Sequence, residues 1–180
     1  MNRKKCIMLN RKRFLYTAIT GTAAILLNPI KVKANTFADE KPPFDTALVK
    51  EFVGTSHRDM AKVVELYSAY PALLNVAWDW GGGDFETALG AASHVGYIEL
   101  VNYLVDKGAQ MNFLTLCLLG KTDMVKNMLT AYPALLNMKG PHGFSPLHHA
   151  NQGEDNALEV KEYLVSLGAV ETKFKMPFHD

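Results

Sequence analysis

The chain is poor in cysteine, with two in 180 residues. Cys6 lies in a basic N-terminal stretch, and Cys117 lies in the apolar run LTLCLLG. If the N-terminal stretch is removed, a single cysteine remains, and an intramolecular disulfide is then excluded. The apolar surroundings of Cys117 predict a small buried hydrophobic side chain rather than a reactive thiol.

Acidic side chains are absent from the first 34 residues, which carry eight basic ones. The rest of the chain holds 11 of the 19 basic residues and all 18 acidic ones, a net charge of −7. Nucleic-acid binding needs a basic patch, so the charge of this larger part argues against a nucleic-acid partner.

The N-terminal stretch also lacks an apolar run of membrane-spanning length. Its longest, YTAITGTAAILLNPI, has about 15 residues, whereas a transmembrane helix needs roughly 20. A basic start, a short apolar run and small residues before Asn35 predict an export signal over residues 1–34, cleaved after Ala34 and followed by a linker at 35–43. The string RKRFL resembles a twin-arginine signal, so the protein is expected in the periplasm or otherwise exported, without a membrane partner after cleavage. The alternative is an uncleaved N-terminal anchor.

Motifs of nucleotide binding and of nucleophilic catalysis are missing as well. The glycines of WDWGGGD do not have the G-x-G-x-x-G spacing of a dinucleotide loop. The pairs Ser56-His57 and Ser93-His94 lie outside any nucleophile elbow. No enzymatic activity and no cofactor are therefore expected.

One seven-residue segment, AYPALLN, occurs twice, at residues 69–75 and again at 131–137. A proline disfavours the helical conformation of the residue before it, so Pro71 and Pro133 should end the preceding helices. The leucines that follow are expected to fill the space beneath each turn. The repeated segment thus predicts a way of closing a helical unit rather than a binding site.

Helical patterns recur along the chain in pairs. Four segments carry apolar residues at helical spacing, and each follows a shorter segment rich in alanine or leucine. The longer segments span residues 59–70, 97–108, 122–132 and 157–168, and the shorter ones 47–57, 87–96, 113–120 and 145–153. The sequence predicts four stacked helix pairs, none of which buries its apolar face alone.

Two stretches resemble the ankyrin-repeat family: GFSPLHHA at residues 143–150, and ETALGAASHVGYIELVNYLVDKGAQMN at 86–112. The resemblance implies an all-α fold, an ankyrin-repeat α-solenoid of about four helix pairs, and the chain looks like a set of small exported bacterial ankyrin proteins. Ser145 and Pro146 should begin one inner helix, and in the family the residue at His148 hydrogen-bonds the neighbouring loop. The implied repeats cover about 44–85, 86–112, 113–143 and 144–171, with a tail at 172–180.

The spacing departs from the family pattern at two connections. Between Gln110 and Phe113 there is no room for the β-hairpin that normally joins repeats, whereas the connection from Val76 to Asp84 is long. A binding surface formed by such hairpins should therefore be lopsided.

The resemblance implies a non-catalytic protein–protein interaction module, monomeric rather than oligomeric, that binds a protein such as another exported one on its concave and loop face. Aromatic residues dominate interaction hot spots, and the long connection is rich in them. The predicted partner-binding residues are Trp78, Asp79, Trp80, Phe85, His94, His142, Phe144 and His149.

Two other functions stay open. One is a small-molecule or metal site between the WDWGGG loop and the histidines, formed by His94, His142 and His149 with Asp79. No two histidines have the i, i+4 spacing of a helical metal site and no cysteine lies near, so no metal ligand is predicted. The other is a homo-oligomeric structural element.

Overall fold

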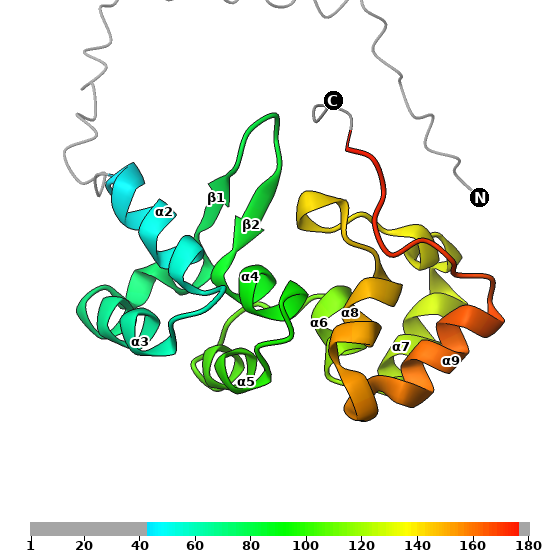
Figure 1. The fold of residues 1–180 in the computed structure, drawn as a ribbon. Coiled ribbons are helices and arrows are strands. Elements are labelled where there is room, and N and C mark those ends of the chain that lie inside the picture. Colours follow the sequence, from blue (N-terminus) through cyan, green and yellow to red (C-terminus); the bar gives the residue numbers. More distant parts are fainter. Residues whose placement is uncertain (1–42, 177–180) are drawn as a thin grey trace, which may run out of the picture. The chain divides into compact units, whose positions relative to one another are not determined.

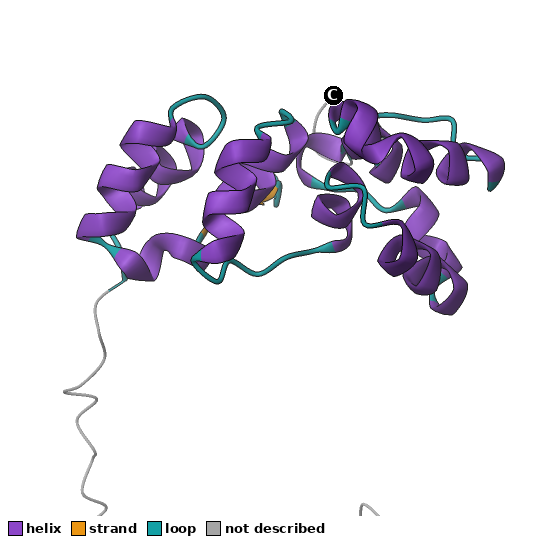
Figure 2. Cartoon of the chain, turned by 90° about the horizontal axis from the view of Figure 1, so that it is seen from below, coloured by secondary structure: helices purple, strands orange, loops and turns teal. Residues whose placement is uncertain are grey.

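The computed structural model describes residues 43–176, which are mostly helical with one small sheet (Figure 1). The predicted helix pairs are present, and within each pair the two helices contact each other. Figure 2 shows the helices from below. The pairs are α2 (Thr46–Thr55) with α3 (Met60–Ala69), α4 (Ala88–His94) with α5 (Ile98–Asp106), α6 (Phe113–Leu118) with α7 (Thr122–Ala131), and α8 (Pro146–Gln152) with α9 (Leu158–Ser166).

Side-chain caps fix where several helices begin. The Asp59 carboxylate accepts a hydrogen bond from the Lys62 amide at 3.0 Å, and the Ser145 hydroxyl accepts one from the His148 amide at 3.1 Å. Pro146 takes the first position of α8, where a missing N–H costs nothing. These caps confirm the predicted starts of α3 and α8.

Both copies of the repeated segment form short 3₁₀-helices, η1 (Pro71–Asn75) and η2 (Pro133–Asn137). The tyrosines before them leave the helical conformation with the same φ of −136°. Leu73 and Leu74 are buried, which confirms their predicted role. Leu135 and Leu136 are only partly buried, so the second copy fills its space less completely.

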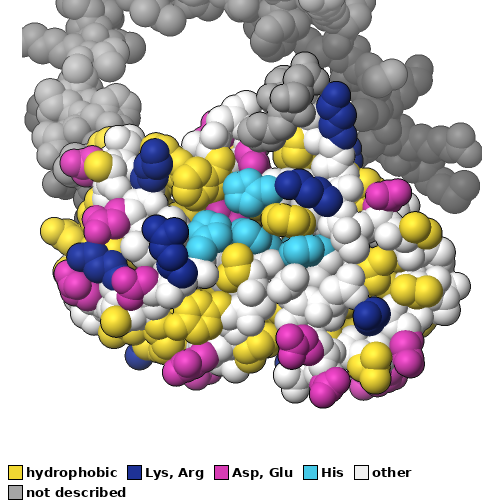
Figure 3. Space-filling model, viewed as in Figure 1, with side chains coloured by type: hydrophobic (Ala, Val, Ile, Leu, Met, Phe, Trp, Pro, Cys, Tyr) yellow, Lys and Arg dark blue, Asp and Glu magenta, His cyan; other side chains and the backbone are white. Residues whose placement is uncertain are grey.

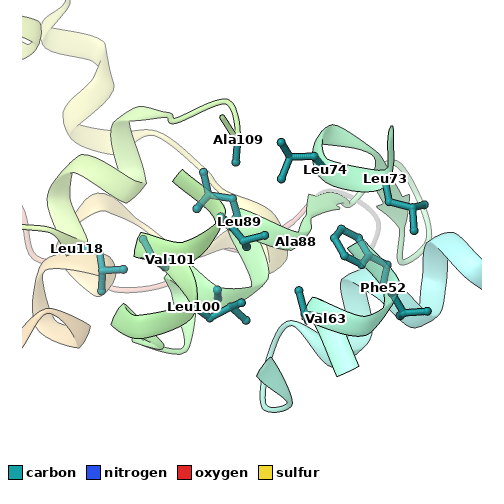
Figure 4. Close-up of a cluster of buried hydrophobic side chains, with 13 residues drawn as sticks. Phe52, Val63, Leu73, Leu74, Ala88, Leu89, Leu100, Val101, Ala109 and Leu118 are labelled. Atoms are coloured by element: carbon teal, nitrogen blue, oxygen red, sulfur yellow. The ribbon is translucent and has the colours of Figure 1, made fainter. Parts of the chain in front are cut away.

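The apolar core consists of two clusters. The first joins α2 to α5 and reaches Leu118 of α6 (Figure 4). The second joins α6 to α9 and contains Cys117, which is fully buried. Burial raises the pKa of the Cys117 thiol to about 12, so the prediction of an unreactive hydrophobic side chain is confirmed.

The long connection between the first two helix pairs forms an antiparallel hairpin of β1 (Ala77–Asp79) and β2 (Phe85–Thr87). All three glycines of its turn have positive φ, and the Asp79 carboxylate accepts hydrogen bonds from two of their amides. This hairpin makes the fold less purely α than predicted. Residues 107–112, between the second and third pairs, contain no strand, as their short length predicts.

The last helix pair contacts more than its neighbour in sequence, because α8 packs on α4 as well as on α6. His148 Nε2 donates a hydrogen bond to the carbonyl oxygen of His94 at 2.8 Å. This bond ties α8 to the end of α4 in the second pair, whereas the resemblance implied a bond to a neighbouring loop. The segment before α8 pairs with residues near the C-terminus through an isolated bridge between Phe144 and Lys173. Residues far apart in sequence thereby meet above α4.

The predicted signal peptide, its cleavage after Ala34 and nearly all of the linker lie outside the described residues. Of the helices in the part that the structure describes, none has both the length and the apolar character needed to cross a bilayer.

The duplicated segment allows a matched test of packing. Replacing the fully buried Leu73 by alanine should destabilise the fold by about 2–5 kcal/mol, the usual cost of such a cavity. Leu135→Ala, at the same place in the second copy, should cost less than about 2 kcal/mol because that side chain is already partly exposed. Urea denaturation of both variants measures the difference, and equal losses would contradict the packing described here.

Candidate metal centre

Four side chains converge on a point beneath the hairpin, at the centre of the face in Figure 3 where histidines gather. They are His57, Glu86, His94 and His142, and one ligand atom from each lies within 4.8 Å of all the others. Glu86 comes from β2, His94 ends α4, and the other two histidines lie in turns. The four ligands thus come from four separate elements.

Glu86 points inward because side chains alternate between the two faces of a strand. In β2 its neighbour Phe85 is 62% exposed, whereas Glu86 is 1% exposed. Successive side chains of a strand point to opposite faces, so one of the two must face the helices. The carboxylate therefore lies in the interior with the histidines around it.

A second carboxylate, that of Asp84, contacts His142 at both its backbone amide and its ring. Asp84 Oδ1 accepts a hydrogen bond from the His142 amide at 2.8 Å, and Asp84 Oδ2 lies 2.8 Å from His142 Nδ1. The backbone of His142 has a φ of 57°, which is uncommon for a residue with a side chain, within the short helix η3 (Pro141–Gly143). Asp84 thus fixes both the unusual backbone and the ring that it presents.

The distances around Glu86 are short. Its Oε1 lies 3.1 Å from His94 Nε2, and its Oε2 lies 3.4 Å from His57 Nε2 and 3.5 Å from His142 Nε2. The indole of Trp80 donates a hydrogen bond to Oε2 at 2.8 Å. One carboxylate oxygen therefore has a fixed donor, and the other faces His94.

The hydrogen bonds on the far side of two rings decide which nitrogen carries the proton. His57 Nδ1 lies 3.0 Å from the carbonyl oxygen of Gly54, and His142 Nδ1 lies against the Asp84 carboxylate. A carbonyl and an ionised carboxylate can only accept, so each Nδ1 must carry a proton. In the neutral imidazole, Nε2 then presents a lone pair toward Glu86.

Two atoms of the cluster are left without a hydrogen bond. Among the described residues, Glu86 Oε1 and His94 Nε2 are buried with no partner in acceptable geometry, although they are in contact. A buried polar atom left unsatisfied costs about 1–3 kcal/mol. Lone pairs and a carboxylate that face one another are stabilised only by a positive charge, which is either a proton or a metal ion.

The ionisation state of Glu86 agrees with the need for a positive charge beside it. Burial works to raise the pKa of Glu86, but the adjacent imidazoles of His57 and His94 outweigh it and lower the pKa to about 2. When His57 takes up a second proton, on Nε2, this N–H can donate to Glu86, and that hydrogen bond raises the pKa of His57. The carboxylate is thus held ionised in the interior.

Several predicted partner-binding residues are engaged within this cluster instead. His94 and His142 are ligand candidates, and the indole N–H of Trp80 is committed to Glu86. The Phe144 ring is stacked between His94 and His148, with ring centroids at 5.0 and 4.0 Å. These side chains contact one another, which leaves less of their surface for a protein partner.

The hairpin residues are placed differently. Phe85 and Asp79 are exposed, and Trp78 is half-buried, with Lys50 Nζ at 5.7 Å from the centroid of its ring. Asp79 lies at the hairpin turn, apart from the four ligands, so the structure does not bring it into a metal site.

The expected exposure of His149 is wrong. Its side chain is 1% exposed, and Nδ1 lies 2.9 Å from the carbonyl oxygen of Ser145. Burial lowers the pKa of His149 to about 4, so it stays neutral. Because α8 packs on both α4 and α6, the face that carries His149 is covered rather than open.

Sequence reasoning missed two members of the cluster, His57 and Glu86. In the sequence, His57 is marked only by its neighbour Ser56, and Glu86 only by its place at the start of a repeat. Their spacing carries no local signal, because 29 positions separate them, with α3, η1 and β1 in between. Only the alternation of Phe85 and Glu86 along a strand could have indicated an inward carboxylate.

No known protein-family model matches this chain, and the search of curated proteins finds no relative. The resemblance to ankyrin repeats therefore stays a prediction.

The assigned tautomers can be checked directly. In metal-free protein at pH 9, above the ordinary histidine pKa of about 6.5, long-range ¹H–¹⁵N spectra should show a proton on Nδ1 of both His57 and His142. Asp84→Asn removes one acceptor, so His142 should change its tautomer while His57 does not. An unprotonated Nδ1 on either ring of the unmutated protein would contradict the assignment.

Proposed function

We propose that the protein binds one divalent first-row transition-metal ion through His57, Glu86, His94 and His142. The observation that carries the proposal is the convergence of four ligand atoms within 4.8 Å of one another, two of them buried and without a hydrogen-bond partner among the described residues. An ion placed among these atoms would satisfy both and would neutralise the buried carboxylate.

The donor set selects the kind of ion. Imidazole nitrogens suit zinc, copper, iron and nickel, whereas calcium and magnesium prefer oxygen ligands. Three imidazoles and one carboxylate therefore favour a transition metal. The sole cysteine of the described residues, Cys117, belongs to the second core cluster and is not part of the site.

The surroundings of the four ligands support the same proposal. Metal-bound histidines usually donate their second ring N–H to a carboxylate or a backbone carbonyl, which fixes the ring and its tautomer. His142 does so to Asp84, and His57 to Gly54. Trp80 orients the Glu86 carboxylate in the same manner. Such outer contacts pre-organise a site before the ion arrives.

We propose an ankyrin-type solenoid as the scaffold. Support comes from the four helix pairs and from the Ser145 cap with Pro146 behind it. The site lies where the hairpin meets the turn after α2, the end of α4 and the turn before α8. Export of this domain, predicted from residues 1–34, is part of the same proposal.

Metal binding should be measurable as stabilisation. Zn²⁺ added to chelator-treated protein should bind with one-to-one stoichiometry, and free metal at 100 times the Kd should add about 2.7 kcal/mol to the free energy of unfolding. Glu86→Gln should weaken binding by at least about 100-fold, more than is typical of outer-shell changes. Calorimetry gives the affinity and thermal melts give the stabilisation.

The matched control is His148→Gln, which removes a nearby imidazole outside the cluster but keeps a donor for the His94 carbonyl. Its affinity for zinc should equal that of the unmutated protein. The proposal fails if folded, unmutated protein shows no zinc-dependent change in melting temperature, or if Glu86→Gln binds zinc as tightly.

A second function, a protein-binding surface on the outer face of the hairpin, is favoured by the exposure of Phe85, at 62%. Asp79, also exposed, lies opposite Phe85 in the strand pair, whereas the half-buried Trp78 lies opposite Glu86 and so on the inner face. Large exposed aromatic side chains are typical anchors of protein interfaces. We keep the predicted interaction module as this narrower proposal.

A variant of the outer face separates the two functions. Phe85→Ala should abolish capture of a stoichiometric protein partner from the exported fraction while zinc affinity stays unchanged. Tyr132→Ala, which removes another exposed aromatic ring outside the hairpin, serves as the control and should leave capture intact. Equal capture by all three proteins would remove the hairpin from the interface.

A further inference from the structure

An open pocket of about 690 Å³ lies beside the four candidate metal ligands, and His57 and His142 are part of its lining. One wall is a face of α2, from Ala47 to Thr55, with the turn after it, and the other contains Trp80 and His142. Its volume lies within the roughly 300–1,000 Å³ typical of small-molecule sites. The pocket is therefore large enough for a small ligand next to the ion.

This pocket reaches the more exposed members of the cluster. The side chains of His57 and His142, which line it, are 22% and 27% exposed, whereas His94 is 9% exposed and Glu86 is fully buried. An exchangeable coordination position of the ion would therefore open toward the pocket.

The charges around the pocket favour an anion. Lys50 and Arg58 line it, and the acid among its lining residues, Glu51, lies 3.6 Å from Lys62 Nζ. Figure 3 shows basic side chains next to the histidines on this face. Two cations and a partly neutralised carboxylate leave the pocket with positive charge, to which the metal would add.

The pocket also has a shaped wall. The Trp80 indole is fixed at one end by its bond to Glu86 and lies close to Gly54 of α2, where a Cβ would be 3.9 Å from the ring. A ligand would thus meet a rigid aromatic surface in addition to the cations.

We propose that the pocket binds a small molecule carrying an oxyanion, a carboxylate or a phosphate, with one oxygen on the metal. Lys50 and Arg58 hold the negative charge, and Trp80 packs against the body of the ligand. This inference rests on the proposed metal site, since the ion supplies the first contact.

Co²⁺ tests the proposal because its visible spectrum reports the number and type of its ligands. Inorganic phosphate, and separately acetate, is titrated into the Co²⁺-loaded protein. At least one should change the spectrum in a saturable way, and the stronger of the two identifies the oxyanion class. Lys50→Met with Arg58→Met should raise the Kd of that anion at least about tenfold, because two charge-assisted contacts are lost.

The control double variant, Lys107→Met with Lys161→Met, removes two positive charges outside the pocket and should leave the anion affinity unchanged. If Co²⁺ binds but neither anion alters its spectrum, the oxyanion inference is overturned and the metal site stands. Equal anion affinity in the pocket variant and the unmutated protein overturns it as well. If Co²⁺ itself does not bind, the proposed function fails and the inference fails with it.

Discussion

The described part of the chain is organised around one buried carboxylate. Glu86 has no exposed surface and is held ionised, although an ion in a protein interior loses several kcal/mol of hydration. It is stabilised by Trp80 and by three imidazoles that reach it from separate segments. A single charge thus draws the hairpin, the turn after α2, the end of α4 and the turn before α8 to one place.

That convergence also explains how the helix pairs pack. Asp84 of the hairpin binds His142, 58 residues away, and His148 of α8 binds the carbonyl of His94 in α4. The two bonds tie α8 and the turn before it to α4 and the hairpin. The last pair thus packs against the second pair in addition to the third. Stacking of apolar faces alone would connect only successive pairs, so the polar cluster adds long-range contacts that the hydrophobic core does not require.

Features encoded by neighbouring residues could be predicted from the sequence. Asp59 and Ser145 cap helices, Pro71 ends a helix, and Cys117 lies in an apolar run. Each of these features depends only on residues nearby in the sequence. The orientation of His149 could not be predicted, because it depends on which helices cover α8. The cluster could not be predicted either, since its members lie in two turns, in a strand and at the end of a helix. Tertiary packing decides that these segments meet, and no spacing rule joins His57 to His142.

The hairpin separates the two proposed functions by the geometry of a strand. Glu86 and Phe85 are adjacent, yet one is buried among imidazoles and the other is exposed to solvent. Because strand side chains alternate, a partner that contacts Phe85 would bind the outer face of the element whose inner face holds the metal ligand. The two proposed functions therefore use opposite faces of one short hairpin and need not compete for the same side chains.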